Sequence, residues 1–172
     1  PRSSSAASDV YKRQIPFWAK DGGRGMINAR SETVSEKPSF RHAFSKRRCL
    51  IPSSGFYEWE KTENGKQPWF ISGKHQPLVF AGIWEQWESP EGFSVKTCAI
   101  LTCEANELMA QIHHRMPVIL QEKERNIWLD PQPKLDLKFL LRPCSQELLQ
   151  AWPVSSRVNR PVFNEPDCFA PI

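Results

Sequence analysis

Two side chains in this sequence combine a residue type and a setting that suit acid–base chemistry, Glu58 and His113. Glu58 stands in an aromatic run between Tyr57 and Trp59, so it faces either open solvent or a cleft. In a cleft, the loss of water would raise the pKa of the carboxyl group and suit it to proton transfer. His113 precedes an arginine and a run of apolar residues, and histidine titrates near neutral pH. The pattern leaves two interpretations open: cleft-facing acid–base groups, or a solvent-exposed Glu58 and a surface or capping His113.

Asn28 follows a glycine-rich stretch at residues 22–25, where the backbone can approach a ligand closely. The stretch matches neither a GxGxxG fingerprint nor a Walker loop, so it gives little support for nucleotide binding. The amide of Asn28 is suited to orienting a sugar or a carbonyl group. An ordinary turn asparagine is the alternative.

The cysteines and histidines do not form a recognisable metal-binding pattern. There are five cysteines, an odd number, and no pair has the CxxC spacing of a zinc site. The adjacent His113 and His114 would point to opposite sides of a strand and so would not hold a metal ion together. We expect no metal and no cofactor, and we expect the cysteines to be small buried residues in a reducing compartment.

Basic residues are concentrated in the first third of the sequence, close to Phe17 and Trp18. Cations that bind phosphates, interleaved with rings on which bases stack, are typical of single-stranded nucleic-acid binding. The net charge of +4 is compatible with an anionic partner but is too small to require one. A solvated basic face is the alternative for these residues, which are Arg24, Arg30, Arg41, Lys46, Arg47 and Arg48.

The chain has 172 residues, enough for one domain with a substantial core. Its 15 prolines favour a fold rich in loops and strands over a helix bundle. No apolar stretch approaches the length of a membrane-spanning helix, and no secretory signal is present. Residues 1–14 are rich in serine and alanine and lack apolar periodicity. We predict a disordered or unrelated leader there and a folded domain over residues 15–172.

The elements that would position these side chains are short. A helix is predicted over 38–44, with its proline in the first turn and apolar residues spaced i, i+4. Strands are predicted at 49–51 and 56–60, separated by a turn at 52–55. Along the second strand, Glu58 shares one face with the other even-numbered residues, and the aromatic Tyr57 and Trp59 share the opposite face.

The middle of the sequence is predicted to form an antiparallel meander. Asn64-Gly65 is a strong hairpin signal, and apolar runs separated by turn residues follow it. The fold class is therefore α+β, with a mostly antiparallel, closed sheet and short peripheral helices. Further strands are predicted at 69–71, 78–87, 95–102, 117–120 and 151–158, and further helices at 105–110, 122–129 and 135–141.

Several segments together resemble the SOS-response-associated peptidase (SRAP) family, whose members process abasic sites in single-stranded DNA. In chain order they are INARSETV at 27–34, RRCLIPSSGFYEW at 47–59, IHHRMPVIL at 112–120 and PVSSRVN at 153–159. The resemblance runs from about Ile15 to the C-terminus. It implies an α+β fold with a β-barrel-like core and a bacterial cytoplasmic protein, associated with the nucleoid during DNA damage. The implied partner is abasic single-stranded DNA, and the implied state is a monomer that binds no membrane and no metal.

The resemblance also implies a mechanism. In the family, removal of the initiator methionine exposes an N-terminal cysteine, which is the self-processing or peptidase step. The α-amine and thiol of that cysteine condense with the aldehyde of an opened abasic site and leave a thiazolidine crosslink.

Residues of this chain are assigned roles by their positions in the matching motifs. Asn28 resembles the residue that orients the cysteine or the sugar, Glu58 the residue that shuttles protons, and His113 the residue that assists ring opening or crosslink reversal. Arg30 resembles a phosphate-binding arginine and Trp18 part of an aromatic wedge at the lesion, and Arg24 and Arg48 are further predicted DNA contacts.

One departure from the family pattern matters for the mechanism. The family begins Met-Cys-Gly-Arg, whereas the first cysteine here is Cys49, inside the RRCLIP segment. We therefore expect a truncated reading frame joined to an unrelated leader, unable to form the crosslink and reduced in stability. Non-covalent binding of single-stranded DNA is the main alternative function, and a general protease is a weaker one because no cysteine has a clear activating environment.

Overall fold

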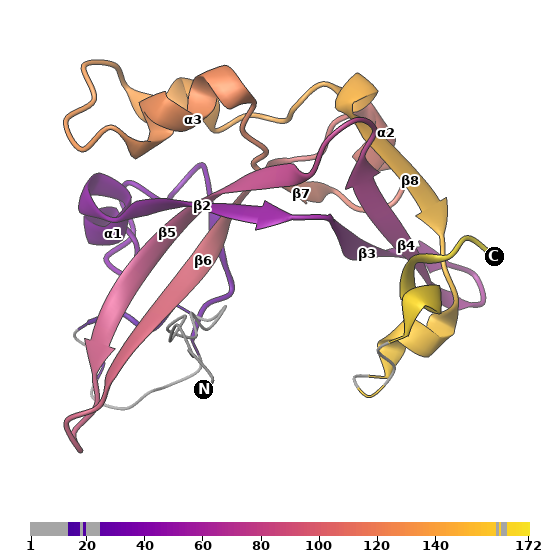
Figure 1. The fold of residues 1–172 in the computed structure, drawn as a ribbon, viewed down its shortest axis with the longest axis horizontal. Helices are drawn as coiled ribbons and strands as arrows, with labels where there is room; N and C mark the ends of the chain where they lie inside the picture. Colours follow the sequence, from indigo (N-terminus) through magenta and orange to yellow (C-terminus); the bar gives the residue numbers. More distant parts are fainter. Residues whose placement is uncertain (1–13, 18, 20–24, 161, 163–164) are drawn as a thin grey trace, which may run out of the picture.

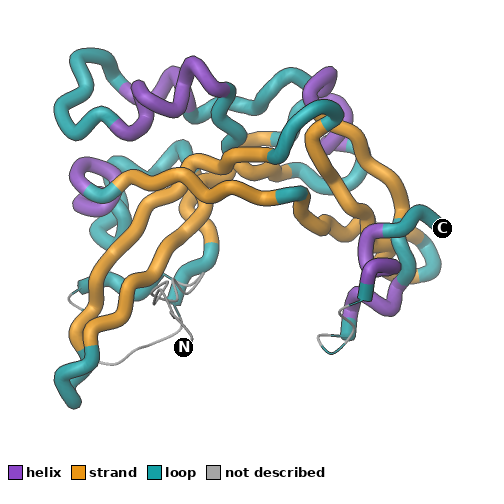
Figure 2. The backbone as a smooth tube through the Cα atoms, in the orientation of Figure 1, coloured by secondary structure: helices purple, strands orange, loops and turns teal. Residues whose placement is uncertain are grey.

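The computed structural model describes residues 14–17, 19, 25–160, 162 and 165–172. Its strands form two sheets that lie side by side (Figure 1; Figure 2). The strands are β1 (Asn28–Arg30), β2 (Arg48–Ser53), β3 (Gly55–Thr62), β4 (Gly65–Gly73), β5 (Leu78–Glu88), β6 (Ser94–Glu104), β7 (Arg115–Pro117) and β8 (Leu149–Pro153). The larger sheet has the order β1-β6-β5-β2, with β7 also paired to β6, and the smaller sheet has the order β3-β4-β8.

The predicted α+β class is confirmed, but the closed sheet is wrong for the described residues. These residues form a mixed sheet, in which β1 runs parallel to β6, and a separate antiparallel sheet. The predicted meander is also interrupted, because β4 and β5 belong to different sheets and β2 pairs with β5 instead of β3. Strands β2 to β6 and β8 overlap the predicted strands, β7 begins earlier than the strand predicted at 117–120, and β1 was not predicted. The partner of each strand depends on how the chain crosses between the sheets.

Glycine at position 55 allows the chain to pass from the larger sheet to the smaller one. Only Ser54 separates β2 from β3. A Cβ atom at Gly55 would lie 2.3 Å from Cζ of Phe70 and 2.5 Å from the carbonyl oxygen of Ile71. No side chain fits in that space, so the absence of a Cβ lets β3 begin directly against β4.

The segment that contains β7 fills the place where β5 and β6 separate. Met116 pairs with Cys103 of β6. The amide of Val118 then donates to the carbonyl of Leu101, and the carbonyl of Val118 accepts from the amide of Ala81. Because this segment bonds to both neighbouring strands, the loop that immediately precedes it is firmly placed, and that loop carries His113.

Within the described ranges, three α-helices accompany the sheets: α1 (Arg41–Lys46), α2 (Glu107–Ala110) and α3 (Glu122–Leu129). The bounds of α3 match the prediction, and a reciprocal capping box between Gln121 and Glu124 fixes its start. Short 3-10 helices occupy Leu137–Leu140, Gln146–Leu148, Ser156–Asn159 and Pro166–Phe169, so the predicted α-helix at 135–141 is a single tight turn. No helix in the described part of the chain is long and apolar enough to cross a membrane.

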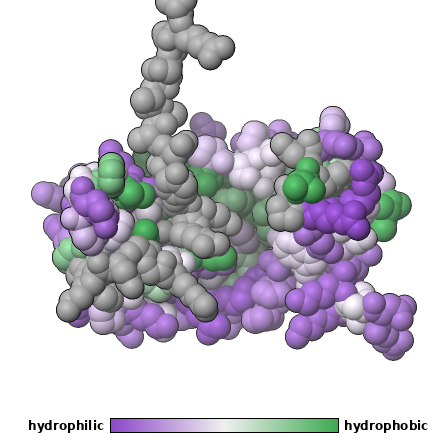
Figure 3. Space-filling model, turned by 90° about the horizontal axis from the view of Figure 1, so that it is seen from below, coloured by the Kyte–Doolittle hydropathy of each residue, from purple (hydrophilic) through white to green (hydrophobic). Residues whose placement is uncertain are grey.

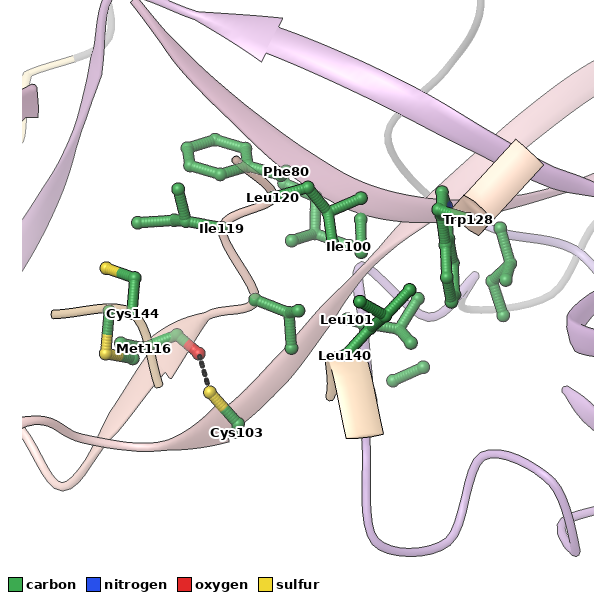
Figure 4. Close-up of a cluster of buried hydrophobic side chains, with 14 of the residues drawn as sticks. Phe80, Ile100, Leu101, Cys103, Met116, Ile119, Leu120, Trp128, Leu140 and Cys144 are labelled. Atoms are coloured by element: carbon green, nitrogen blue, oxygen red, sulfur yellow. Dashed lines mark hydrogen bonds between the residues drawn. The ribbon is translucent and has the colours of Figure 1, made fainter. Parts of the chain in front are cut away.

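The main core lies between the larger sheet and the segments that carry α3 and the first 3-10 helix (Figure 4). Trp128 of α3 is fully buried, and its indole N–H donates to the carbonyl of Cys49 on β2. Leu101 and Leu120 are buried in the same cluster. Each such apolar side chain contributes about 1.5–3 kcal/mol when removed from water, so the sheet is a stable support for the loops at its ends.

Candidate functional site

A cavity of about 430 Å³ lies between the β3–β4 hairpin and the residues that follow α2. It brings together Glu58 and His113, the predicted acid–base residues, from widely separated parts of the chain. The complete lining is Glu58, Trp59, Glu60, Lys61, Lys66, Ala110, Gln111, Ile112, His113 and His114. The cavity therefore contains carboxylates, imidazoles and lysines, which can exchange protons with a ligand and hold an anion.

The β3 strand gives Glu58 its position. Glu58 lies opposite Trp69 of β4, and the next residue on the same face, Glu60, accepts a 2.9 Å hydrogen bond from the indole N–H of Trp69. On the other face, Tyr57 packs against Phe70, with ring centroids 5.2 Å apart. These contacts confirm the predicted alternation along β3, which places the half-buried Glu58 on the face opposite Tyr57 and Phe70.

The loop after α2 gives His113 its position. Asn106 caps this helix by accepting from the amide of Met109, and the amide of His113 donates to the carbonyl of Met109 at 2.7 Å. Nδ1 of His113 lies 3.1 Å from the amide nitrogen of Arg115, which donates to it. In the tautomer in which Nδ1 accepts this bond, Nε2 carries the proton, so Nε2 is the atom available for proton exchange.

His113 and His114 do not follow the geometry expected of a strand. Their ring centroids are 4.4 Å apart because both residues lie in the loop before β7. The expectation that adjacent histidines diverge was therefore wrong here. Within the described residues, no group of three or more His, Cys, Asp or Glu side chains is placed to hold a metal ion.

An ion pair that the sequence reasoning missed connects β7 with the segment after β1. Arg115 donates to both carboxylate oxygens of Glu32, at 2.6 and 3.0 Å, and to the carbonyl of Thr102. The hydrogen bonds from Arg115 lower the pKa of Glu32. Glu32 lies in the INARSETV segment and Arg115 in the IHHRMPVIL segment, both of which carry the family resemblance. The opposite charges of these two residues were the one sequence signal that could have suggested the ion pair.

Asn28 and Arg30 project from the same exposed side of β1, since the fully buried Ala29 lies between them. Asn28 is aligned with Ile100 of β6, and β1 is an edge strand of the larger sheet. Asn28 is not among the residues that line the cavity of Glu58 and His113.

Arg48 has a structural role in this fold. Its guanidinium donates to the carbonyls of Phe44 and Ser45 beside α1 and of Trp128 and Asp130 at the end of α3. Burial lowers the pKa of Arg48. Binding a phosphate would require these bonds to be given up, so the structure supplies no support for the predicted DNA contact. The other predicted contacts, Trp18 and Arg24, lie outside the described residues.

The cysteines are not disposed as nucleophiles. All five lie in the described part of the chain, and none is in a disulfide. Burial raises the pKa of the Cys49 and Cys103 thiols to about 12 and that of Cys144 to about 11. Neutral thiols are poor nucleophiles, so these three residues offer no support for a general cysteine protease. Cys98, Cys103 and Cys144 are buried as expected, whereas Cys49 and Cys168 are only half-buried.

A second cavity, of about 380 Å³, opens on the larger sheet and is mostly apolar. It is lined by Cys49, Leu50, Ile51, Pro52, Trp84, Lys96 and Cys98. The view from below shows hydrophobic residues in a hollow in the middle of the molecule, with a largely hydrophilic margin (Figure 3). This second cavity has no carboxylate or imidazole in its lining.

The chain is similar to proteins of one family. The family model described as SOS response associated peptidase (SRAP) matches residues 8–161. Over 160 residues the chain is 47% identical to the abasic site processing protein YoqW of Bacillus subtilis, an alignment that covers 89% of this chain and 71% of that protein. It is 34% identical to the abasic site processing protein HMCES of Gallus gallus over an alignment 199 residues long, which covers 99% of this chain and 59% of that protein.

Solved structures show the same fold. A protein from Bacteroides thetaiotaomicron matches with a TM-score of 0.86 and 32% sequence identity, over 93% of this chain and 74% of that one. A protein from Bordetella bronchiseptica matches with a TM-score of 0.75 and 27% identity, over 83% of this chain and 74% of that one. The sheet arrangement described above is therefore shared with relatives of low sequence identity.

Proposed function

Since the chain belongs to the SOS response associated peptidase family, we propose that it acts on abasic sites in single-stranded DNA. The observation that carries this proposal is the shared cavity of Glu58 and His113. An abasic site exposes an aldehyde when its sugar ring opens, and addition of an amine to that aldehyde requires proton transfers. A carboxylate and an imidazole in one cavity supply groups that can give and take those protons.

The proposed roles follow the chemistry of each side chain. Glu58 transfers the protons that accompany loss of water when an amine and the aldehyde form an imine. His113, through Nε2, assists opening of the sugar ring and reversal of the product. Asn28 orients the sugar or the attacking group through its amide, and Arg30 on the same exposed side of β1 binds a neighbouring phosphate.

The family reaction also needs an α-amine and a thiol on one residue, which together close a thiazolidine ring with release of one water. None of the five cysteines of this sequence has a free α-amine, because the first of them is Cys49. We expect the polypeptide of this sequence to form no heat-stable crosslink through its own cysteines. A shifted band on a denaturing gel after incubation with abasic single-stranded DNA would contradict that expectation.

Free L-cysteine provides the experiment that tests the acid–base site directly, because it carries both the amine and the thiol. The rate of its condensation with an abasic site in single-stranded DNA is measured by mass spectrometry, with and without the protein. We expect an acceleration of about 100-fold, at the lower end of general acid–base catalysis. Glu58→Gln and His113→Asn should remove it, whereas Glu63→Gln, an exposed carboxylate outside the cavity, should not. Equal rates with and without protein would overturn the proposal.

Non-covalent binding of single-stranded DNA is the second candidate function. The observation that favours it is the exposure of basic side chains on the described surface, among them Arg30 of β1 and Lys61 and Lys66 of the β3–β4 hairpin. A binding module without lesion chemistry would bind intact and abasic oligonucleotides equally well, whereas an abasic-site protein would prefer the abasic one. Salt dependence separates the two functions poorly, because both involve phosphate contacts.

A further inference from the structure

Two lysines stand directly opposite each other at the end of the β3–β4 hairpin. Lys61 of β3 is aligned with Lys66 of β4, and both side chains are exposed. The turn between them is held by Gly65, whose φ of 127° is accessible to glycine and strained for other residues. Like charges in directly opposed positions destabilise a pair of strands. The hairpin therefore carries an arrangement that is unfavourable for its own folding.

Neither lysine forms an ion pair with a carboxylate among the residues that the structure describes. The nearest acidic neighbour along β3, Glu60, accepts a hydrogen bond through one carboxylate oxygen from the indole of Trp69. Two opposed cations that no carboxylate pairs with directly are suited to an anion from outside the protein.

Both lysines line the cavity that contains Glu58 and His113. Glu58 is three residues before Lys61 on β3, so the two side chains leave opposite faces of the strand, about 10 Å apart along it. Because β3 is an edge strand of the smaller sheet, a ligand at this edge can reach both faces. The carboxylates of the cavity would repel a nucleic-acid backbone, whereas the lysines would attract it.

We propose that Lys61 and Lys66 form a phosphate-binding clamp that holds the backbone of single-stranded DNA beside the reactive sugar. This inference rests on the proposed function, because it takes the ligand of the cavity to be DNA. The two ammonium groups bind a phosphodiester near the lesion, and the sugar of the abasic site lies beside Glu58 and His113. The repulsion between the lysines is relieved when the phosphate lies between them.

The test measures the affinity for a single-stranded oligonucleotide as a function of salt. Each phosphate contact on a single strand contributes about 0.7 to the magnitude of the slope of log affinity against log salt concentration. At 0.1 M salt, one such contact therefore contributes about fivefold in affinity. Lys61→Ala with Lys66→Ala should therefore weaken binding about 25-fold and reduce the slope by about 1.4. The matched control is Lys123→Ala with Lys134→Ala, which removes the same charge from exposed positions on and after α3, far from the hairpin (Figure 1).

A charge reversal separates binding from folding. Lys66→Glu places a carboxylate opposite Lys61, so the hairpin should gain an ion pair and the melting temperature should not fall. The same change should weaken DNA binding at least as much as the double alanine variant. A loss of affinity that matches a loss of stability would contradict the clamp.

The outcomes distinguish this inference from the proposed function. If the wild-type chain binds no single-stranded DNA, the proposed function and the clamp both fail. If the wild type binds and the hairpin variants keep its affinity and salt slope, the clamp fails and the proposed function stands. If the control variants lose as much affinity as the hairpin variants, the contacts are non-specific charge and the clamp again fails.

Discussion

Glu32 and Arg115 form a two-point ion pair between segments that are 83 residues apart in the sequence. Glu32 follows the strand that carries Asn28 and Arg30, and Arg115 is the second residue after His113. The planar guanidinium matches both carboxylate oxygens, and it also binds the carbonyl of Thr102 on β6. The pair therefore holds the strand with the exposed Asn28 and the loop with His113 in a fixed relation.

The first prediction concerns the energy of this pair. A double-mutant cycle with Glu32→Gln and Arg115→Lys should give a coupling free energy of about 0.5–1 kcal/mol, because the carboxylate is partly exposed and solvent screens it. Lysine does not replace the two-point contact, since it carries a single compact charge. Urea unfolding of the four proteins measures the coupling. Strictly additive effects would contradict it.

The pH dependence of the same pair is the second prediction. Arg115 lowers the pKa of Glu32 from its ordinary value of 4.5. The carboxylate therefore contributes stability that is fully present above pH 4.5 and is lost as the pH falls through the lower pKa of the folded state. The free-energy difference between wild type and Glu32→Gln should shrink as the pH is lowered below 4.5. A difference that stays constant across that range would show that the charge of Glu32 is not involved.

Arg48 should be essential for stability, which is the third prediction. It joins the end of α1 to the end of α3 by donating to backbone carbonyls of both. Arg48→Ala and Arg48→Lys should each lower the free energy of unfolding by about 1–3 kcal/mol, because either change leaves partly buried carbonyls without a donor. Arg30→Ala, at an exposed position, should change it by less than about 0.5 kcal/mol. Chemical denaturation compares the three, and equal effects of Arg48 and Arg30 variants would contradict the assignment.

The crossing between the sheets gives the fourth prediction. Gly55→Ala would place a methyl group 2.5 Å from the backbone carbonyl oxygen of Ile71, which cannot move away without breaking β4. The expected loss is about 3 kcal/mol, as for overpacking in a core. The neighbouring Ser54→Ala, at an exposed position, is the control and should stay within about 0.5 kcal/mol of wild type. Thermal unfolding of both variants measures the difference, and a silent Gly55→Ala would contradict the close contact.

Thiol reactivity gives the fifth prediction. With a pKa of about 12, Cys49 is a thiolate in roughly one molecule in 10⁴ at pH 8, far less than an ordinary cysteine. Alkylation of Cys49 by iodoacetamide in the native protein should be at least 1,000-fold slower than in urea, by about the ratio of thiolate fractions. The native rate should also rise about tenfold per pH unit between pH 8 and pH 10. Peptide mass spectrometry measures both rates, and a fast native rate would show that the thiol is not shielded.

Local features of the fold were predictable because they depend on neighbours in the sequence. The bounds of α3 follow from its capping residues and from the proline two positions after its last residue. The hairpin at Asn64-Gly65 and the alternation that separates Glu58 from Tyr57 follow from turn chemistry and from the period of a strand. The antiparallel meander failed because the pattern of a strand does not encode its partner. The pairing of the strands depends on the crossing between the sheets at Gly55, where β3 lies so close to β4 that no Cβ atom fits. That close contact is between residues that are not neighbours in the sequence, so a local pattern does not predict it.

The sequence by itself identified Glu58 and His113 as candidates for acid–base chemistry, because residue type and motif are local properties. Only the tertiary structure decided that these two line one cavity, since their meeting depends on β7 filling the space between β5 and β6. The same distinction applies to Arg48. Its sequence context predicts a surface cation that binds DNA, whereas in the fold its guanidinium donates hydrogen bonds to carbonyls at the ends of α1 and α3. Its partners are backbone carbonyls, which every residue possesses, and only the packing of two helix ends brings those carbonyls within reach of one guanidinium.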